Sequence, residues 1–203
     1  MTPGLAMLTP ALLREFEEAW ARQGAPVLKH LRPGLTTEEI TRLTQPLGLE
    51  LPDEARMWWA WHDGVSRNIP FGAARELGPD LPFLPLEEAA SLYQHAREQA
   101  VRVAGEQADH WWRPTWFPIT MRLGEIRFDC SGPQNAPSPI YWAYSHDHDA
   151  EGLTVPKVES FGTMVKWWTE ALMSGAWRYD GENQRWERHP EFLPPDRERS
   201  GLV

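Results

Sequence analysis

The order of helical and strand periodicities constrains the fold of this chain more than any other feature of its sequence. Helical patterns fill the segment up to Trp111, short strand-like segments follow from Trp116, and a strongly amphipathic stretch opens at Ser160. A parallel sheet would require strands that alternate regularly with helices, and this alternation is absent. We therefore expect an α+β fold in a single domain, with a mixed or antiparallel sheet and flanking helices.

Capping residues place the predicted helices. Thr9 and Pro10 are typical of a helix start and Gly24 of a helix end, while Thr36 and Glu39 have the spacing of a capping box. The predicted helices cover residues 10–23, 36–47, 52–61, 87–107 and 160–174. The segment 65–82 is rich in Gly and Pro and is predicted to be a loop.

Strands are predicted where β-branched and aromatic residues are separated by turn-forming residues. They cover residues 116–120, 123–129, 139–144 and 153–158, and a terminal hairpin is predicted around Asp180-Gly181. The end of the chain is polar and proline-rich. We expect one domain over residues 1–188 and a disordered tail over residues 189–203.

Composition excludes several classes of protein. The net charge of −9 repels phosphate backbones and anionic lipid surfaces, so nucleic acid and membranes are disfavoured as partners, whereas a basic protein would be attracted. No apolar run or leader segment predicts export or membrane insertion. The single cysteine, Cys130, allows no intramolecular disulfide and fits a cytoplasmic location, and we interpret it as a passive thiol.

Tryptophan is unusually frequent, with 12 residues in 203. Trp58-Trp59, Trp111-Trp112 and Trp167-Trp168 are adjacent pairs, and neighbouring residues of a helix point about 100° apart, so both members of a pair rarely face one core. Some tryptophans are therefore expected near the surface, where they are typical of protein interfaces.

Two clusters suggest chemistry. His146 to Asp149 alternates imidazoles and carboxylates and could bind a divalent metal, but a hydrated loop is the simpler interpretation, so we predict no metal. Asp129 could form an acid/base pair with His62 and Asp63 if the fold joined them. The standard nucleotide, acyl-transfer and zinc-protease motifs are missing, and we predict neither catalysis nor a cofactor.

Six short segments follow one another in a characteristic order between residues 35 and 180. They are Leu49 to Glu54 with the helix that ends at Asp63-Gly64, Phe83 to Glu88, Trp116 to Ile119, Ile126 to Asp129, Pro139 to Tyr141, and Glu159 to Phe161. In this order and spacing the chain resembles the SUKH superfamily (Smi/Knr type). The resemblance implies a protein-interaction module with a mixed sheet.

The resemblance also implies a function. Bacterial members of the superfamily look like immunity proteins that sequester and neutralise toxin domains, often nucleases, whereas fungal relatives act in cell-wall regulation. An immunity protein with a basic toxin partner is therefore our leading hypothesis. A regulatory scaffold protein is one alternative, and a small-molecule-binding protein or hydrolase that uses Asp129 and residues 146–149 is another.

The partner surface is predicted on loops that carry acids and aromatics outside the apolar stripes of the helices. The residues predicted to bind the partner are Asp63, Asp109, Trp111, Trp112, Asp147, Asp149 and Glu151.

Overall fold

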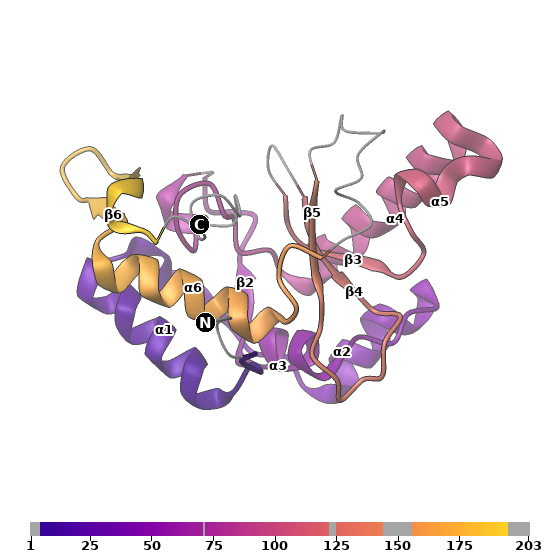
Figure 1. The fold of residues 1–203 in the computed structure, drawn as a ribbon, viewed down its shortest axis with the longest axis horizontal. Helices are drawn as coiled ribbons and strands as arrows, with labels where there is room; N and C mark the ends of the chain where they lie inside the picture. Colours follow the sequence, from indigo (N-terminus) through magenta and orange to yellow (C-terminus); the bar gives the residue numbers. More distant parts are fainter. Residues whose placement is uncertain (1–4, 71, 122–124, 144–155, 195–203) are drawn as a thin grey trace.

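A computed structural model describes residues 5–70, 72–121, 125–143 and 156–194 (Figure 1). The helices are α1 (Pro10–Gln23), α2 (Thr37–Thr44), α3 (Asp53–Trp61), α4 (Leu86–Ala104), α5 (Ala108–Trp111) and α6 (Phe161–Ser174). The strands are β1 (Leu31–Pro33), β2 (His62–Val65), β3 (Trp116–Met121), β4 (Glu125–Asp129), β5 (Ile140–Ala143), β6 (Trp177–Asp180) and β7 (Arg185–Arg188). The predicted α+β class is confirmed.

Helix ends lie where the capping residues predicted them. The hydroxyl of Thr9 accepts a hydrogen bond from the Leu12 amide, and Thr36 and Glu39 form a reciprocal capping box. Ser160 caps α6 in the same way, and Gly175 ends that helix with a positive φ of 80°. These local signals mark the starts of α1, α2 and α6 and the end of α6.

The central sheet has the antiparallel strand order β3-β4-β5. Phe117 lies opposite Phe128, which lies opposite Ile140, so one face of the sheet is apolar. Helices cover this face, because Trp59 of α3 and Tyr93 of α4 contact Phe117, and Phe161 of α6 contacts Phe128. The first half of the predicted fourth strand over residues 153–158 lies outside the described residues, and in its second half Val158 forms a bridge to Ile140.

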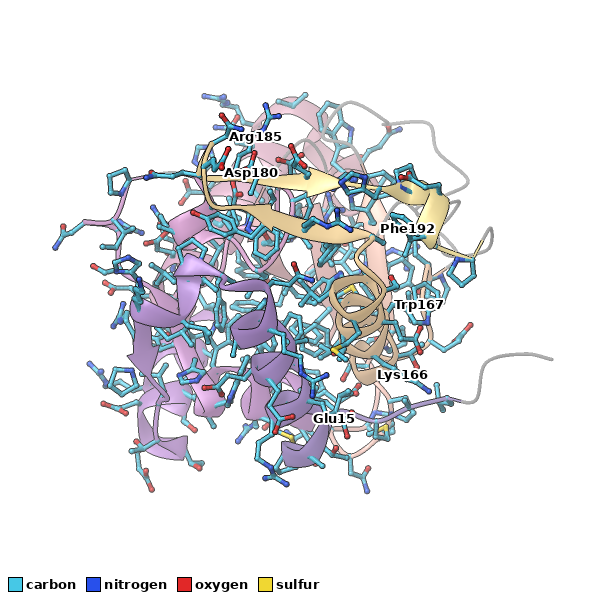
Figure 2. All side chains as sticks on the ribbon, turned by 90° about the vertical axis from the view of Figure 1, so that its left-hand side faces the viewer. Glu15, Lys166, Trp167, Asp180, Arg185 and Phe192 are labelled. Atoms are coloured by element: carbon cyan, nitrogen blue, oxygen red, sulfur yellow. The ribbon has the colours of Figure 1, made fainter. Side chains whose placement is uncertain are left out.

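The helix α1 and the hairpin β6-β7 extend the core beyond the sheet. Helices α1 and α6 lie side by side, and Figure 2 shows the hairpin above the end of α6, with Asp180 and Arg185 at its turn. Trp168 of α6 packs against both Phe16 of α1 and Trp177 of β6. One continuous apolar core therefore connects the two ends of the chain.

The structure corrects two expectations, on the tryptophan pair of α3 and on residues 62–65. Trp58 and Trp59 are both fully buried, because α3 lies between two parts of the core: Trp58 faces Phe161, whereas Trp59 faces the sheet. Residues 62–65 extend into strand β2, which pairs with β1, and neither strand was predicted. The segment 65–82 is mostly loop, as predicted, although it contains the short 3₁₀ helix Ala73–Arg75 and most of residues 73–82 are buried.

The predicted tail begins with ordered backbone. Pro190–Phe192 form a 3₁₀ helix, and Leu193 packs against the core. Residues 195–203 lie outside the described residues.

Candidate functional site

A buried carboxylate holds the scaffold of the sheet in place. Glu54 on α3 is 1% exposed, and its two oxygens accept four backbone hydrogen bonds. The donors are Leu8 at 2.7 Å and Gly162 at 2.8 Å to Oε1, and Ser138 at 2.6 Å and Phe161 at 3.3 Å to Oε2. One side chain thereby joins the N-terminal segment, the loop before β5 and the start of α6, where the helix dipole favours negative charge.

Asp63 is a second structural carboxylate, which corrects its predicted place on the partner surface. It is 2% exposed, its Oδ2 forms an ion pair with Arg32 at 2.8 Å, and its Oδ1 accepts a hydrogen bond from the Leu86 amide at the start of α4. Burial raises the pKa of this carboxyl above its usual value. Asp63 fixes β2 to α4 and is closed to a partner.

Trp112 and Arg127 form the centre of the opposite, outer face of the sheet. The Arg127 guanidinium lies 4.1 Å from the Trp112 ring centroid and 4.9 Å from that of Trp116, and Tyr141 packs against Trp116 at 5.4 Å. The Trp112 indole N–H donates to the Trp116 carbonyl at 2.9 Å. Trp112 is only 4% exposed, so the structure corrects its predicted role as a surface anchor: it supports the sheet through cation–π and packing contacts.

Asp109 and Trp111 lie at the outer end of α4 and α5 (Figure 1). The Asp109 side chain is 64% exposed, and its Oδ1 forms an ion pair with Arg97 of α4 at 2.8 Å. Arg97 also donates to the Trp112 carbonyl, so it ties α5 to α4. Trp111 is partly buried against the core. These two residues remain accessible at the rim of the tryptophan–arginine cluster, defined as Trp112, Trp116 and Arg127.

The other predicted partner residues, Asp147, Asp149 and Glu151, lie outside the described residues, as does the candidate metal cluster His146 to Asp149. Within the described ranges, no three His, Cys, Asp or Glu side chains come together in a way that could hold a metal ion. None of the helices described here has the length and apolar character of a membrane span.

The suggested acid/base pair has other partners in the fold. The Asp129 carboxylate accepts a hydrogen bond from the Ser131 amide at 2.9 Å, and His62 Nδ1 lies 3.1 Å from the Arg32 carbonyl. Asp63 is occupied by Arg32 and Leu86. Burial, with a smaller contribution from the charge of Asp129, raises the pKa of the Cys130 thiol to about 12, so this thiol is uncharged at neutral pH and a poor nucleophile.

Sequence reasoning missed the roles of Glu54 and Arg127. Glu54 carries a weak signal, because it lies four residues before Trp58 and so on the same face of the helix, yet an acid at a helix start is usually solvated. Arg127 carries a clearer one: it alternates with Ile126 and Phe128 in a strand that pairs with a tryptophan-containing strand. A cation at such a position can be predicted to stack on the indoles.

Comparison with known families agrees with this geometry. No curated protein matches the sequence. The family model described as SMI1 / KNR4 family (SUKH-1) matches residues 34–167, which is well over half of the chain and includes α2 to α5, the central sheet and the start of α6. The chain therefore belongs to the SMI1/KNR4 family (SUKH-1).

Proposed function

We propose that this protein is an immunity protein that binds a toxin domain and thereby neutralises it. Membership of the SMI1/KNR4 family carries the proposal, since bacterial members resemble immunity proteins. The contacts of the candidate chemical groups agree with binding: Asp63 joins β2 to α4, Asp129 accepts a local hydrogen bond from the Ser131 amide, and burial raises the pKa of the Cys130 thiol. Under this proposal the protein acts in the cytoplasm, without a cofactor.

The proposed partner is basic, because the chain has a net charge of −9. Opposite charge accelerates encounter between proteins, whereas buried aromatic anchors chiefly slow their separation. We place the contact at Asp109 and Trp111, which are accessible at the end of α5, and on Asp147, Asp149 and Glu151. Asp63 and Trp112 are left out of this surface because they are buried.

Co-expression with a toxin candidate tests the function. The candidate is the C-terminal domain of a large exported protein encoded beside this gene, which should inhibit growth alone and lose its toxicity when this chain is present. The two proteins should also elute together at a fixed stoichiometry in size-exclusion chromatography. Continued toxicity with no complex would refute the proposal for that pair.

Charge reversal tests the surface. Replacing Asp147, Asp149 and Glu151 with Lys should slow association at least about tenfold and weaken its salt dependence, measured by stopped-flow fluorescence. The matched control reverses Glu15, Glu18 and Glu182, which are exposed on α1 and the hairpin, at the opposite end of the molecule from α5 (Figure 1). Both triple variants change the net charge equally. Equal association rates in the two variants would show that position does not matter and would exclude this surface.

A further inference from the structure

A cavity lies between α4 and the loop that follows β2. Its volume is about 280 Å³, and it is lined by Arg67, Leu84, Glu88, Ser91, Leu92 and His95. Four of these residues, at 88, 91, 92 and 95, have the i, i+3, i+4, i+7 spacing that places them on one face of a helix. Nothing in the family assignment gives this cavity a role.

The loop that carries Arg67 is held against the core. The Val65 amide donates to the Phe83 carbonyl at 3.1 Å, and the Ile69 amide donates to the Ser66 carbonyl at 3.0 Å. Leu84, next to Phe83, is 3% exposed and forms the apolar floor of the cavity. The wall opposite α4 is therefore formed by the buried Leu84 and by Arg67, whose loop begins at the bond between Val65 and Phe83 and is closed by the bond between Ile69 and Ser66.

Glu88 orients the cation of the cavity. Its Oε1 lies 2.8 Å from Arg67 Nε, and its Oε2 lies 3.2 Å from Nη2 of the buried Arg75. Both carboxylate oxygens thus face guanidinium groups. The Arg67 side chain is 66% exposed, and in its described contacts only Nε is engaged, so its two terminal nitrogens are left to donate.

The polar groups that remain can all donate hydrogen bonds. Besides Arg67, the exposed Ser91 hydroxyl and the exposed His95 imidazole line the cavity, while Leu84 and Leu92 offer apolar surface. A guanidinium fixed through Nε matches a carboxylate that approaches its terminal nitrogens, and two apolar side chains match a short methylene stem. A basic ligand would instead meet the exposed Arg67 guanidinium, while the Glu88 carboxylate is shared between the ion pairs with Arg67 and Arg75.

We infer that this cavity binds a carboxylate on a short aliphatic stem, presented as an acidic side chain by a protein partner. The open mouth, with Ser91 and His95 exposed, suits a side chain that enters from a facing surface better than a free metabolite, which binding sites usually enclose. This inference does not depend on the identity of the toxin or on the proposed function.

Nuclear magnetic resonance titration of the isolated full chain tests the inference. The probe is N-acetyl-glutamate methylamide, and the matched uncharged control is N-acetyl-glutamine methylamide. The amide signals of Ser91, Leu92 and His95 should shift saturably with the glutamate compound, with a dissociation constant on the order of 1–10 mM, and should not saturate with the glutamine compound. Equal responses to the two compounds would overturn the carboxylate assignment.

Two further arms test the residue and the source of the carboxylate. Arg67→Gln should weaken binding at least about tenfold, whereas Arg102→Gln, an exposed change about two turns farther along α4, should leave it unchanged. Since Arg67 is exposed, the rest of the amide spectrum should show that this variant is folded. Glutarate that binds tenfold more tightly than the glutamate compound would reject the side-chain source, and unchanged binding by Arg67→Gln would reject the site.

Discussion

Replacing Glu54 with Gln should destabilise the fold through its hydrogen bonds alone, since the two side chains have nearly the same shape. Oε1 accepts from Leu8 and Gly162, and Oε2 accepts from Ser138 and Phe161. The amide NH₂ of glutamine must replace one of these oxygens. Two backbone donors then face another donor, and rotating the amide only exchanges which pair is affected.

The size of the effect follows from those two lost bonds. A hydrogen bond to a charged group contributes roughly 1.5–3 kcal/mol, so two of them contribute roughly 3–6 kcal/mol. The neutral amide is easier to bury than a carboxylate, which offsets part of this loss. We expect a net destabilisation of about 3 kcal/mol, which for 203 residues corresponds to a decrease in Tm of about 7 °C.

Urea unfolding followed by tryptophan fluorescence measures the free energy of unfolding. The matched control is Glu50→Gln, four residues earlier, where the exposed carboxylate accepts only a surface hydrogen bond from Gln134 in the described contacts. This control should change the free energy by less than about 0.5 kcal/mol. Hydrogen exchange at Leu8, Ser138 and Gly162 should accelerate in Glu54→Gln. A loss below about 1 kcal/mol would refute the hub role of Glu54.

Three further outcomes test other parts of the structure. Gly162→Ala should destabilise the protein by about 2 kcal/mol or more in urea unfolding, because its Cβ would lie 2.2 Å from the Leu8 nitrogen, whereas Gly132→Ala, with nothing within 4 Å, should be neutral. Asp63→Asn should make the slope of unfolding free energy against pH more positive in the acidic range above the usual pKa of a carboxyl group, because the raised pKa of Asp63 means that the folded state binds more protons there. The contribution of Asp63 is present at low pH and is lost as pH rises through the folded pKa, and an unchanged slope would contradict this. With a pKa of about 12, Cys130 should react with iodoacetamide at pH 8 about 50-fold more slowly in the folded protein than in an unfolded control. The folded protein has a much smaller fraction of thiolate, and this outweighs the higher nucleophilicity of each thiolate; equal rates would reject the raised pKa.

The helices were predictable because their signals are local. Thr9, Thr36 and Ser160 satisfy backbone donors within one turn, so the sequence determines where each helix begins. Strand β2 was not predictable, since its three-residue partner β1 lies about 30 residues away and Gly64 resembles a stop signal.

The candidate surface was predicted less well than the fold. Acids and tryptophans in a loop-like context looked exposed, but exposure depends on contacts between distant segments. Asp63 is buried because Arg32 and the start of α4 reach it, and Trp112 is buried because Arg127 stacks on its ring. A sequence pattern gives the chemical type of a side chain, whereas such long-range partners decide whether that side chain supports the fold or faces a partner.

The parts of the chain outside the family match brace the fold at one end of the molecule. Helix α1 and the hairpin complete the packing around Trp168, and the Trp20 indole donates to the Leu77 carbonyl at 2.7 Å, so these additions share the core with the matched region. The proposed toxin surface and the carboxylate cavity instead use only residues from 67 to 151, which lie within the match over 34–167. If both sites bind partners, specificity among members of this family resides in side chains that the shared scaffold carries. The segments outside the match support this scaffold indirectly: they hold α6 in position, and Glu54 links the start of α6 to the loop before β5.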